Sequence, residues 1–241
     1  IICIPEVEAF RAEELKFSNV RIVVSKIRGQ VPQRALGFHE VKGIFVLQLD
    51  DDVLLKETAL ELLVYSLSLK GVKNVVGPSY YDRPDYKQSV HRYSDGILGW
   101  LSSLEASIIC GAPWGLKRMG KISTLGTNYG VNPRYVKGEL MQTEWLPGGC
   151  VLSYKEDLIL DSFYPFTGKA YGEDVIHSIL RNQQNITHWV VPQAKCSTEI
   201  IWNVRDLNIL RTEVRVKAYI IKLLKKEVRL RHWIWVFLLF I

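Results

Sequence analysis

The segment LQLDDDV, residues 47–53, places three consecutive aspartates directly behind an apolar run. That run, GIFVLQL at 43–49, is typical of a buried strand covered on both faces, as in a parallel sheet. Two carboxylates about 4 Å apart repel by roughly 1 kcal/mol even in bulk water, so the triplet needs a compensating partner. Because ligands of open α/β sheets bind outside the carboxyl ends of strands, a divalent cation is the expected partner.

Within the triplet, the strand geometry separates the three side chains. Residues i and i+2 share a face, so Asp50 and Asp52 are expected to point together and Asp51 away. A polar strand-to-loop turn with a helix N-cap among the three is the alternative. An EF-hand loop would need a ligand at 54 and a glycine at 55, which are Leu54 and Leu55, and no GxxxxGK[ST] loop occurs.

Strands and helices alternate over the first 77 residues, which predicts an α/β fold with crossover connections. Strands are expected at 20–26, 43–49 and 73–77, and helices at 6–17, 34–41 and 55–69. Further elements are expected downstream: a helix at 97–109, a Pro-Gly-Gly turn at 147–149 feeding a strand, a helix after Gly172, a strand at 187–193 and a helix from about 207.

The amino-acid composition and charge of the chain limit the kinds of partner that we expect. The chain has 241 residues, 48% of them hydrophobic, enough for one large domain or two small ones with a real core. The net charge of +6 resides in residues 211–231, and no finger, RRM-like or KH-like motif occurs, so nucleic acid is not an expected partner. Four scattered cysteines are typical of core residues in a reducing compartment, with one disulfide left open.

Three segments in order resemble the family 2 nucleotide-sugar glycosyltransferases, inverting enzymes with the GT-A fold. SKIRGQVPQRALGFHEVKGIFVLQLDDDV (25–53) matches the family's strand, glycine loop, arginine, helix and aspartate order. TEWLPGGCVLSYKED (143–157) is similar to its acceptor-side segment, and YGEDVIHSILR (171–181) to its Glu-Asp helix. GKISTLG (120–126) is similar to segments of membrane-associated members. The resemblance covers roughly residues 20–195 and implies a GT-A-like, Rossmann-type mixed sheet flanked by helices.

The resemblance implies a metal-dependent transferase with a nucleoside-diphosphate sugar, expected to be a UDP-sugar, as donor. Asp50 and Asp52 would bind Mn²⁺ or Mg²⁺, which prefer oxygen ligands and bridge diphosphates. Asp51 and Arg34 would contact the donor nucleotide. An arginine that opens a helix is also commonly only a surface charge.

Asp174 is the implied catalytic base, which would take the proton of an acceptor hydroxyl as that oxygen attacks the anomeric carbon and inverts it. Such a base typically contributes about 10²–10⁴-fold. Glu173 would hydrogen-bond the acceptor. The alternative is that both acids only complement the positive end of a helix, an effect of about 0.3–1 kcal/mol.

Trp145, Gly148 and Gly149 are the implied acceptor-binding residues. A tryptophan offers a flat face to a sugar ring, and glycines let backbone N–H groups approach a ligand, although the same residues also suit a plain turn. His177 and His188 are either third metal ligands or ordinary, partly buried histidines.

The sequence differs from the family pattern in two places, and each difference leads to an expectation. Nothing before Ile1 supplies the family's first strand and nucleoside-holding loop, so we expect the N-terminal strand to be missing and Ile1–Ile4 to correspond to the second strand. The Gln-x-x-Arg-Trp motif of processive synthases is absent from the sequence, which favours single-sugar transfer over polymerisation.

Residues 1–206 are therefore expected to form the catalytic domain, and 207–241 a basic, membrane-facing tail. The nine apolar residues 233–241 are too few for a span, whereas the basic helix before them suits an anionic surface. The chain is expected at the cytoplasmic face of a membrane, acting on a glycan, a lipid-linked acceptor or an envelope or capsular polysaccharide. A basic helix packed on the body is the alternative.

Two other functions stay open. One is a nucleotidyltransferase that uses the same aspartate and metal site. The other is a non-catalytic, degenerate transferase that binds or scaffolds at the membrane.

Overall fold

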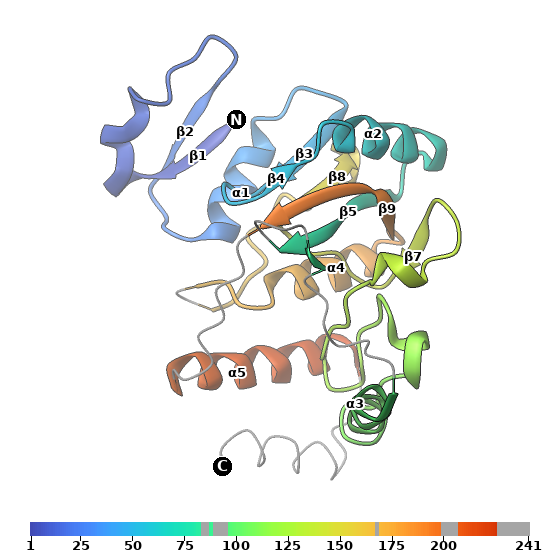
Figure 1. Ribbon diagram of the computed structural model, residues 1–241. Coiled ribbons are helices and arrows are strands. Elements are labelled where there is room, and N and C mark those ends of the chain that lie inside the picture. Colours follow the sequence, from blue (N-terminus) through green and yellow to red (C-terminus); the bar gives the residue numbers. More distant parts are fainter. Residues whose placement is uncertain (83–86, 89–95, 167–168, 199–206, 226–241) are drawn as a thin grey trace.

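A mixed β-sheet forms the centre of the computed structural model, which describes residues 1–82, 87–88, 96–166, 169–198 and 207–225 (Figure 1). Its strands are β3 (Phe45–Leu49), β4 (Leu54–Leu55), β5 (Asn74–Asp82), β6 (Lys87–Gln88), β7 (Met141–Thr143), β8 (Cys150–Tyr154) and β9 (Thr187–Thr198). They run in the order β3–β8–β5–β9–β4, with β6 on β5 and β7 on β9. Only β5 and β9 pair in parallel; the other pairs are antiparallel.

Helices cover both faces of this sheet. Helix α2 (Ala59–Lys70) buries Leu63 and Leu67, one turn apart, in a cluster with Val76 of β5 and Val191 of β9. Helix α4 (Glu173–Gln183) lies on the other side, as Figure 1 shows. The helix–sheet–helix layering confirms the α/β fold class predicted from the sequence.

The first strands stand apart from the main sheet. Strands β1 (Ile2–Pro5) and β2 (Ile22–Ser25) pair in parallel with each other, and a 3₁₀ segment, η1 (Glu6–Ala12), follows β1. Helix α1 (Gln30–His39) packs closely on β1, because a Cβ at Gly37 would lie 2.8 Å from the Cys3 sulfur. Phe38 of α1 packs on Val46 of β3, so this helix joins the small sheet to the large one.

Strand β3 differs from the prediction in its surroundings. It pairs antiparallel with β8, and its exposure alternates along the strand, with Val46 and Gln48 buried and Phe45 and Leu49 exposed. The expected parallel strand covered on both faces is therefore wrong. The antiparallel register places Leu49 opposite Cys150, which brings the aspartate triplet beside the Pro-Gly-Gly turn.

Helix α5 (Leu207–Leu223) packs on the body over its described length. Val216 and Ile220 share a cluster with Ile176 and Ile179 of α4. Of the two interpretations of this basic segment, the structure shows the packed helix for residues 207–223, and residues 226–241 lie outside the described part of the chain. No helix in the described ranges is long and apolar enough to cross a bilayer.

The remaining helical segments lie between β6 and β9. They are α3 (Gly96–Ile108), η2 (Gly115–Arg118), η3 (Pro133–Tyr135) and η4 (Lys155–Asp157). All four cysteines, Cys3, Cys110, Cys150 and Cys196, are free in this structure.

Candidate active site at the end of strand β3

The aspartate triplet and the glycine pair meet through the β3–β8 register. The backbone N–H of Asp50 donates to the Gly149 carbonyl at 2.8 Å, which extends the ladder by one bond beyond the strand. A Cβ at Gly149 would lie 3.4 Å from Asp50 Oδ2 and 3.3 Å from the Tyr80 hydroxyl. A Cβ would thus fit only if these neighbours shifted by a few tenths of an ångström, so the glycine serves close approach as well as the turn.

Gly148 lies against the opposite pair of acids. A Cβ there would lie 2.7 Å from Glu173 Oε1 and 3.4 Å from Asp174 Cβ. Gln48, which shares a strand face with Asp50, donates its side-chain amide to the Gly148 carbonyl. Gly149 thus lies against Asp50, and Gly148 lies against Glu173 and Asp174.

Arg34 of α1 connects the two sets of acids. Its Nη1 donates to Glu173 Oε2 at 2.7 Å, and its Nη2 lies 3.8 Å from Asp50 Oδ1. The Arg34 side chain is only 8% exposed, and its Nη2 finds no hydrogen-bond acceptor in the part of the chain that the structure describes. A buried guanidinium with an unused donor beside a carboxylate is suited to an anionic ligand.

Glu173 and Asp174 open helix α4, where Gly172 adopts a left-handed φ of 63° and lets the chain turn into the helix. Asp174 Oδ1 accepts a hydrogen bond from the Val175 N–H at 2.8 Å. Burial, followed by the negative charge of Glu173, raises the pKa of Asp174 to about 7. A carboxyl that titrates near neutral pH is suited to general-base chemistry.

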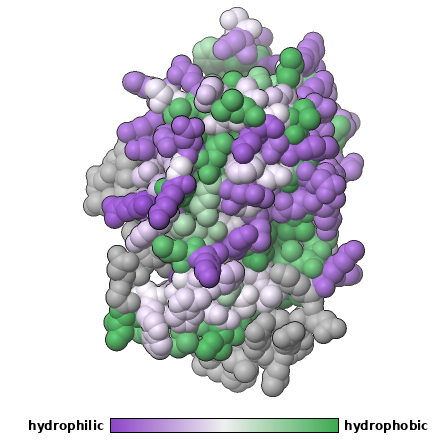
Figure 2. Space-filling view, turned by 90° about the vertical axis from the view of Figure 1, so that its right-hand side faces the viewer, coloured by the Kyte–Doolittle hydropathy of each residue, from purple (hydrophilic) through white to green (hydrophobic). Residues whose placement is uncertain are grey.

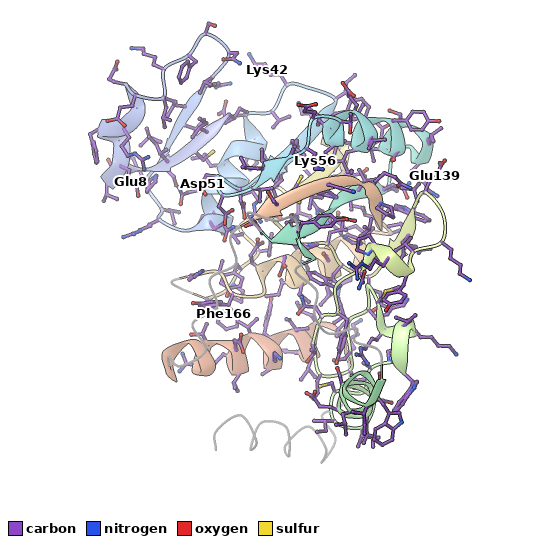
Figure 3. The ribbon with its side chains drawn as sticks, in the orientation of Figure 1. Glu8, Lys42, Asp51, Lys56, Glu139 and Phe166 are labelled. Atoms are coloured by element: carbon purple, nitrogen blue, oxygen red, sulfur yellow. The ribbon has the colours of Figure 1, made fainter. Side chains whose placement is uncertain are left out.

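The three aspartates have different surroundings. Burial raises the pKa of Asp50, and the charges of Glu173 and Asp52 add to this while Arg34 opposes it. Asp50 Oδ2 also accepts from Gln30 Nε2 at 3.3 Å, and Asp52 Oδ2 from the Thr198 hydroxyl at 3.2 Å. Asp51 is exposed and lies at the end of the sheet nearest α1 (Figure 3).

The donor set suits a hard cation only in part. Within the described ranges no three His, Cys, Asp or Glu side chains are arranged to hold a metal ion. Asp50 and Asp52 supply carboxylate oxygens, and the charge of Asp52 still raises the pKa of Asp50, so their mutual repulsion is not fully offset. A Mg²⁺-type ion is commonly bound by one or two carboxylates together with substrate phosphates and water, and two aspartates meet that minimum.

His177 and His188 are both buried in the core. His177 stacks on Phe163 with ring centroids 4.8 Å apart, and burial lowers its pKa well below the usual range. His188 is buried, its Nδ1 lies 3.1 Å from Asn182 Oδ1, and burial lowers its pKa to about 3. In the described ranges neither belongs to a group of three or more candidate metal ligands, so their surroundings match the alternative of ordinary, buried histidines.

Trp145 is also placed in the core. Its indole N–H donates to the Tyr129 carbonyl at 2.9 Å, and the ring packs among Val175, Ile176 and Ile220. Trp145 is only 8% exposed, so neither face of its ring is free to stack on a sugar in this conformation. The structure therefore gives Trp145 a packing role and does not place it at the acceptor side as the sequence led us to expect.

A cavity of ≈ 710 Å³ lies beside the triplet. Its walls come from the end of β1, the start of η1, the β2–α1 loop, the first turns of α1, and Lys169 before α4. The lining residues are Pro5, Glu8, Arg28, Gly29, Gln30, Gln33 and Lys169. Gln30 also donates to Asp50 Oδ2, so the cavity wall and the triplet are in contact through this residue.

Several of these residues were not found by sequence reasoning. Gln30, Tyr80 and Thr198 come from separate elements, and nothing in their local sequence marks them. Gln48 did carry a signal, because it is the one polar residue within the apolar run at 43–49. A polar side chain inside a buried strand indicates a specific partner, here the Gly148 carbonyl.

These features define the chain as a GT-A-like α/β protein, with the candidate site at the carboxyl end of β3. Among solved structures it is similar to the crystal structure of GalNAc-T7 with UDP, GalNAc and Mn²⁺, at a TM-score of 0.51 and 14% identity. The match covers 82% of this chain and 34% of that one, so this chain spans about a third of its neighbour's length. At that identity the likeness is one of fold. No family model matches the sequence, and no curated protein matches it.

Proposed function

We propose that the chain is a metal-dependent, inverting glycosyltransferase that moves a sugar from a nucleoside-diphosphate donor, a UDP-sugar, to a hydroxyl acceptor. One observation carries this proposal. Arg34, Asp50, the Gly148–Gly149 pair and the Glu173–Asp174 pair come from four separate segments and meet around one point beside a cavity. The fold likeness to a structure that contains UDP, GalNAc and Mn²⁺ agrees with it.

The donor side would be the cavity and the triplet. Asp50 and Asp52 would hold Mn²⁺ or Mg²⁺, which when bound neutralises charge on the departing diphosphate. Arg34 Nη2, with its unused donor, would bind an oxygen of the same diphosphate. Arg28 and Lys169 against the single acid Glu8 make the charged side chains of the cavity wall net positive where an anionic nucleotide would lie.

The acceptor side would be the start of α4. Asp174, with its pKa near 7, would be largely ionised slightly above neutral pH and would accept the hydroxyl proton as the acceptor oxygen attacks. Glu173, held by Arg34, would orient the acceptor from the same helix turn. Attack from the side opposite the leaving group inverts the anomeric carbon.

We further propose a glycan or lipid-linked acceptor and a site of action at the cytoplasmic face of a membrane. The apolar face of α5 is used for packing on α4, so this helix would contribute through its exposed cations Arg215, Lys222 and Lys225. Residues 226–241 would supply the apolar part of that contact.

Calorimetric titration of UDP, with GDP in parallel, tests the donor site in the presence of Mn²⁺ and of EDTA. We expect UDP binding that requires Mn²⁺ and weakens at least tenfold in Asp52→Ala. A sugar-donor screen then follows, with Asp174→Asn as the variant that binds donor but transfers no sugar. Release of pyrophosphate in place of nucleoside diphosphate would favour nucleotidyl transfer, and absence of nucleotide binding would favour the scaffold.

A further inference from the structure

Helix α3 presents an apolar stripe to solvent in addition to the face it packs on the body. Ile97, Trp100, Leu101, Leu104 and Ile108 follow the spacing i, i+3, i+4, i+7 and i+11, so they lie along one side of the helix. Ile97 is 76% exposed, Trp100 53% and Ile108 59%. A surface helix normally turns its apolar side inward, and α3 reverses this pattern.

The buried side of α3 is the more polar one. It carries Ser103, Ala106 and, just past the helix, Cys110. Ser103 receives a hydrogen bond from the Arg118 guanidinium at 2.9 Å, and Ser102 receives another at 3.1 Å. These bonds fasten η2 to α3 and fix the outward stripe in place.

Segment η2 and the residue before it extend the stripe. Trp114 is 46% exposed and meets Trp100 edge to face, with ring centroids 6.3 Å apart. Leu116 is exposed beside them, and Lys117 is exposed one residue further on. We call Ile97, Trp100, Leu101, Leu104, Ile108, Trp114 and Leu116 the α3 patch. A contiguous apolar patch on a protein surface often marks an interaction site, whereas single exposed apolar residues are ordinary.

The end of the molecule that carries the α3 patch also carries exposed positive charge. Residues 207–225 hold five basic side chains and one acidic one; Arg215, Lys222 and Lys225 of this segment are exposed, as is Lys117 of η2. Cys110, Leu125 and Ile221 form one cluster, so α3 and α5 belong to the same end, the lower one in Figure 1. Figure 2 shows hydrophilic residues over much of the upper part of one face, and near its lower end mostly residues of intermediate hydropathy with some hydrophobic ones.

We propose that the α3 patch docks on the headgroup region of an anionic lipid membrane. Tryptophan side chains favour the membrane–water boundary, and cations near an anionic surface add attraction to the buried apolar area. A second copy of the chain fits less well, because a symmetric pair would bring two positively charged ends together. This surface is formed by α3 and η2 and does not require residues 226–241.

Co-sedimentation of the full chain with vesicles tests the docking surface. The vesicles are phosphatidylcholine alone or phosphatidylcholine with about a third phosphatidylglycerol. The test variant is Ile97→Gln/Trp100→Gln/Ile108→Gln, and the matched control is Leu60→Gln/Leu69→Gln, which removes exposed leucines from α2. We expect the wild type and the control to bind the anionic vesicles at least about tenfold more strongly than the test variant.

Three outcomes would overturn the docking surface. Equal binding of test variant and wild type would assign vesicle binding to other residues, such as 226–241. An equal loss of vesicle binding in the control variant would show that exposed apolar residues anywhere on the surface contribute to binding, without a specific role for the α3 patch. A wild type that ignores vesicles but forms a dimer that the test variant breaks, seen by sedimentation velocity, would assign the patch to a second copy. Quenching of tryptophan fluorescence by brominated lipid, reduced in Trp100→Phe/Trp114→Phe, adds a readout that does not depend on affinity.

Discussion

Replacement of Asp174 by asparagine should make the protein more stable at alkaline pH while it removes the proposed base. The folded state holds the pKa of this carboxyl at about 7 against an ordinary value of 3.8, chiefly through burial. The folded chain therefore binds more protons than the unfolded chain between these two pH values, so wild-type stability falls as pH rises through this window. The destabilisation is complete above about pH 7 and absent below about pH 4.

The size of the effect follows from the same values. About three pKa units at roughly 1.4 kcal/mol each set a ceiling of about 4 kcal/mol. Asparagine keeps an oxygen that can accept from the Val175 N–H, so the local helix start is preserved. We expect Asp174→Asn to raise the free energy of unfolding by about 1–3 kcal/mol at pH 8, with little difference at pH 4.

Urea denaturation of both proteins at a series of pH values measures this difference without any knowledge of the substrate. Asp161→Asn is the matched control, because Asp161 is exposed. A stability gain that is the same at pH 4 and pH 8, or a loss at pH 8, would refute the argument that burial disfavours the ionised form of Asp174.

Three further changes test the rest of the site. Arg34→Met leaves Glu173 buried without its cation and should lower the free energy of unfolding by about 3–5 kcal/mol in urea, and adding Glu173→Gln should restore part of it; no recovery would contradict the pairing. Gly148→Ala places a Cβ 2.7 Å from Glu173 Oε1, on the carboxylate whose Oε2 bonds Arg34, so sugar transfer should fall at least about tenfold while the melting temperature changes little; unchanged turnover would show that the turn can shift to make room. Trp145→Phe removes the indole bond to the Tyr129 carbonyl, which still accepts from the Gly120 N–H, and should lose about 0.5–1.5 kcal/mol in thermal or urea unfolding, whereas a large rise in acceptor KM would return Trp145 to the acceptor side.

Local signals in the sequence were sufficient for the parts of the site that depend on neighbours along the chain. The apolar run before Asp50 ends as a strand at Leu49, and Gly172 ends a loop where α4 begins at Glu173. The extent of α3 was also predicted within one residue. In each case, the spacing of apolar residues or a glycine decides the backbone conformation.

The pairing of distant segments could not be predicted in the same way. Arg34 and Glu173 are 139 residues apart, and no local pattern shows that they form an ion pair. The apolar run at 43–49 suits either a parallel or an antiparallel strand, and the choice is made by β8, about 100 residues later. Trp145 is a residue type that can offer a flat face to a sugar ring, but side chains of α4 and α5 cover it.

Because Arg34 pairs with Glu173 beside Asp174, the order in which an anion and a hydroxyl enter the site affects the basicity of Asp174. An anion bound by the unused Nη2 leaves the 2.7 Å bond from Nη1 to Glu173 in place, while its negative charge offsets that of the guanidinium. Arg34 lowers the pKa of Asp174, so offsetting its charge would raise that pKa and leave Asp174 a stronger base than before. Basicity then increases only once the anionic ligand is in place, and a hydroxyl that arrives first, water included, meets a weaker base.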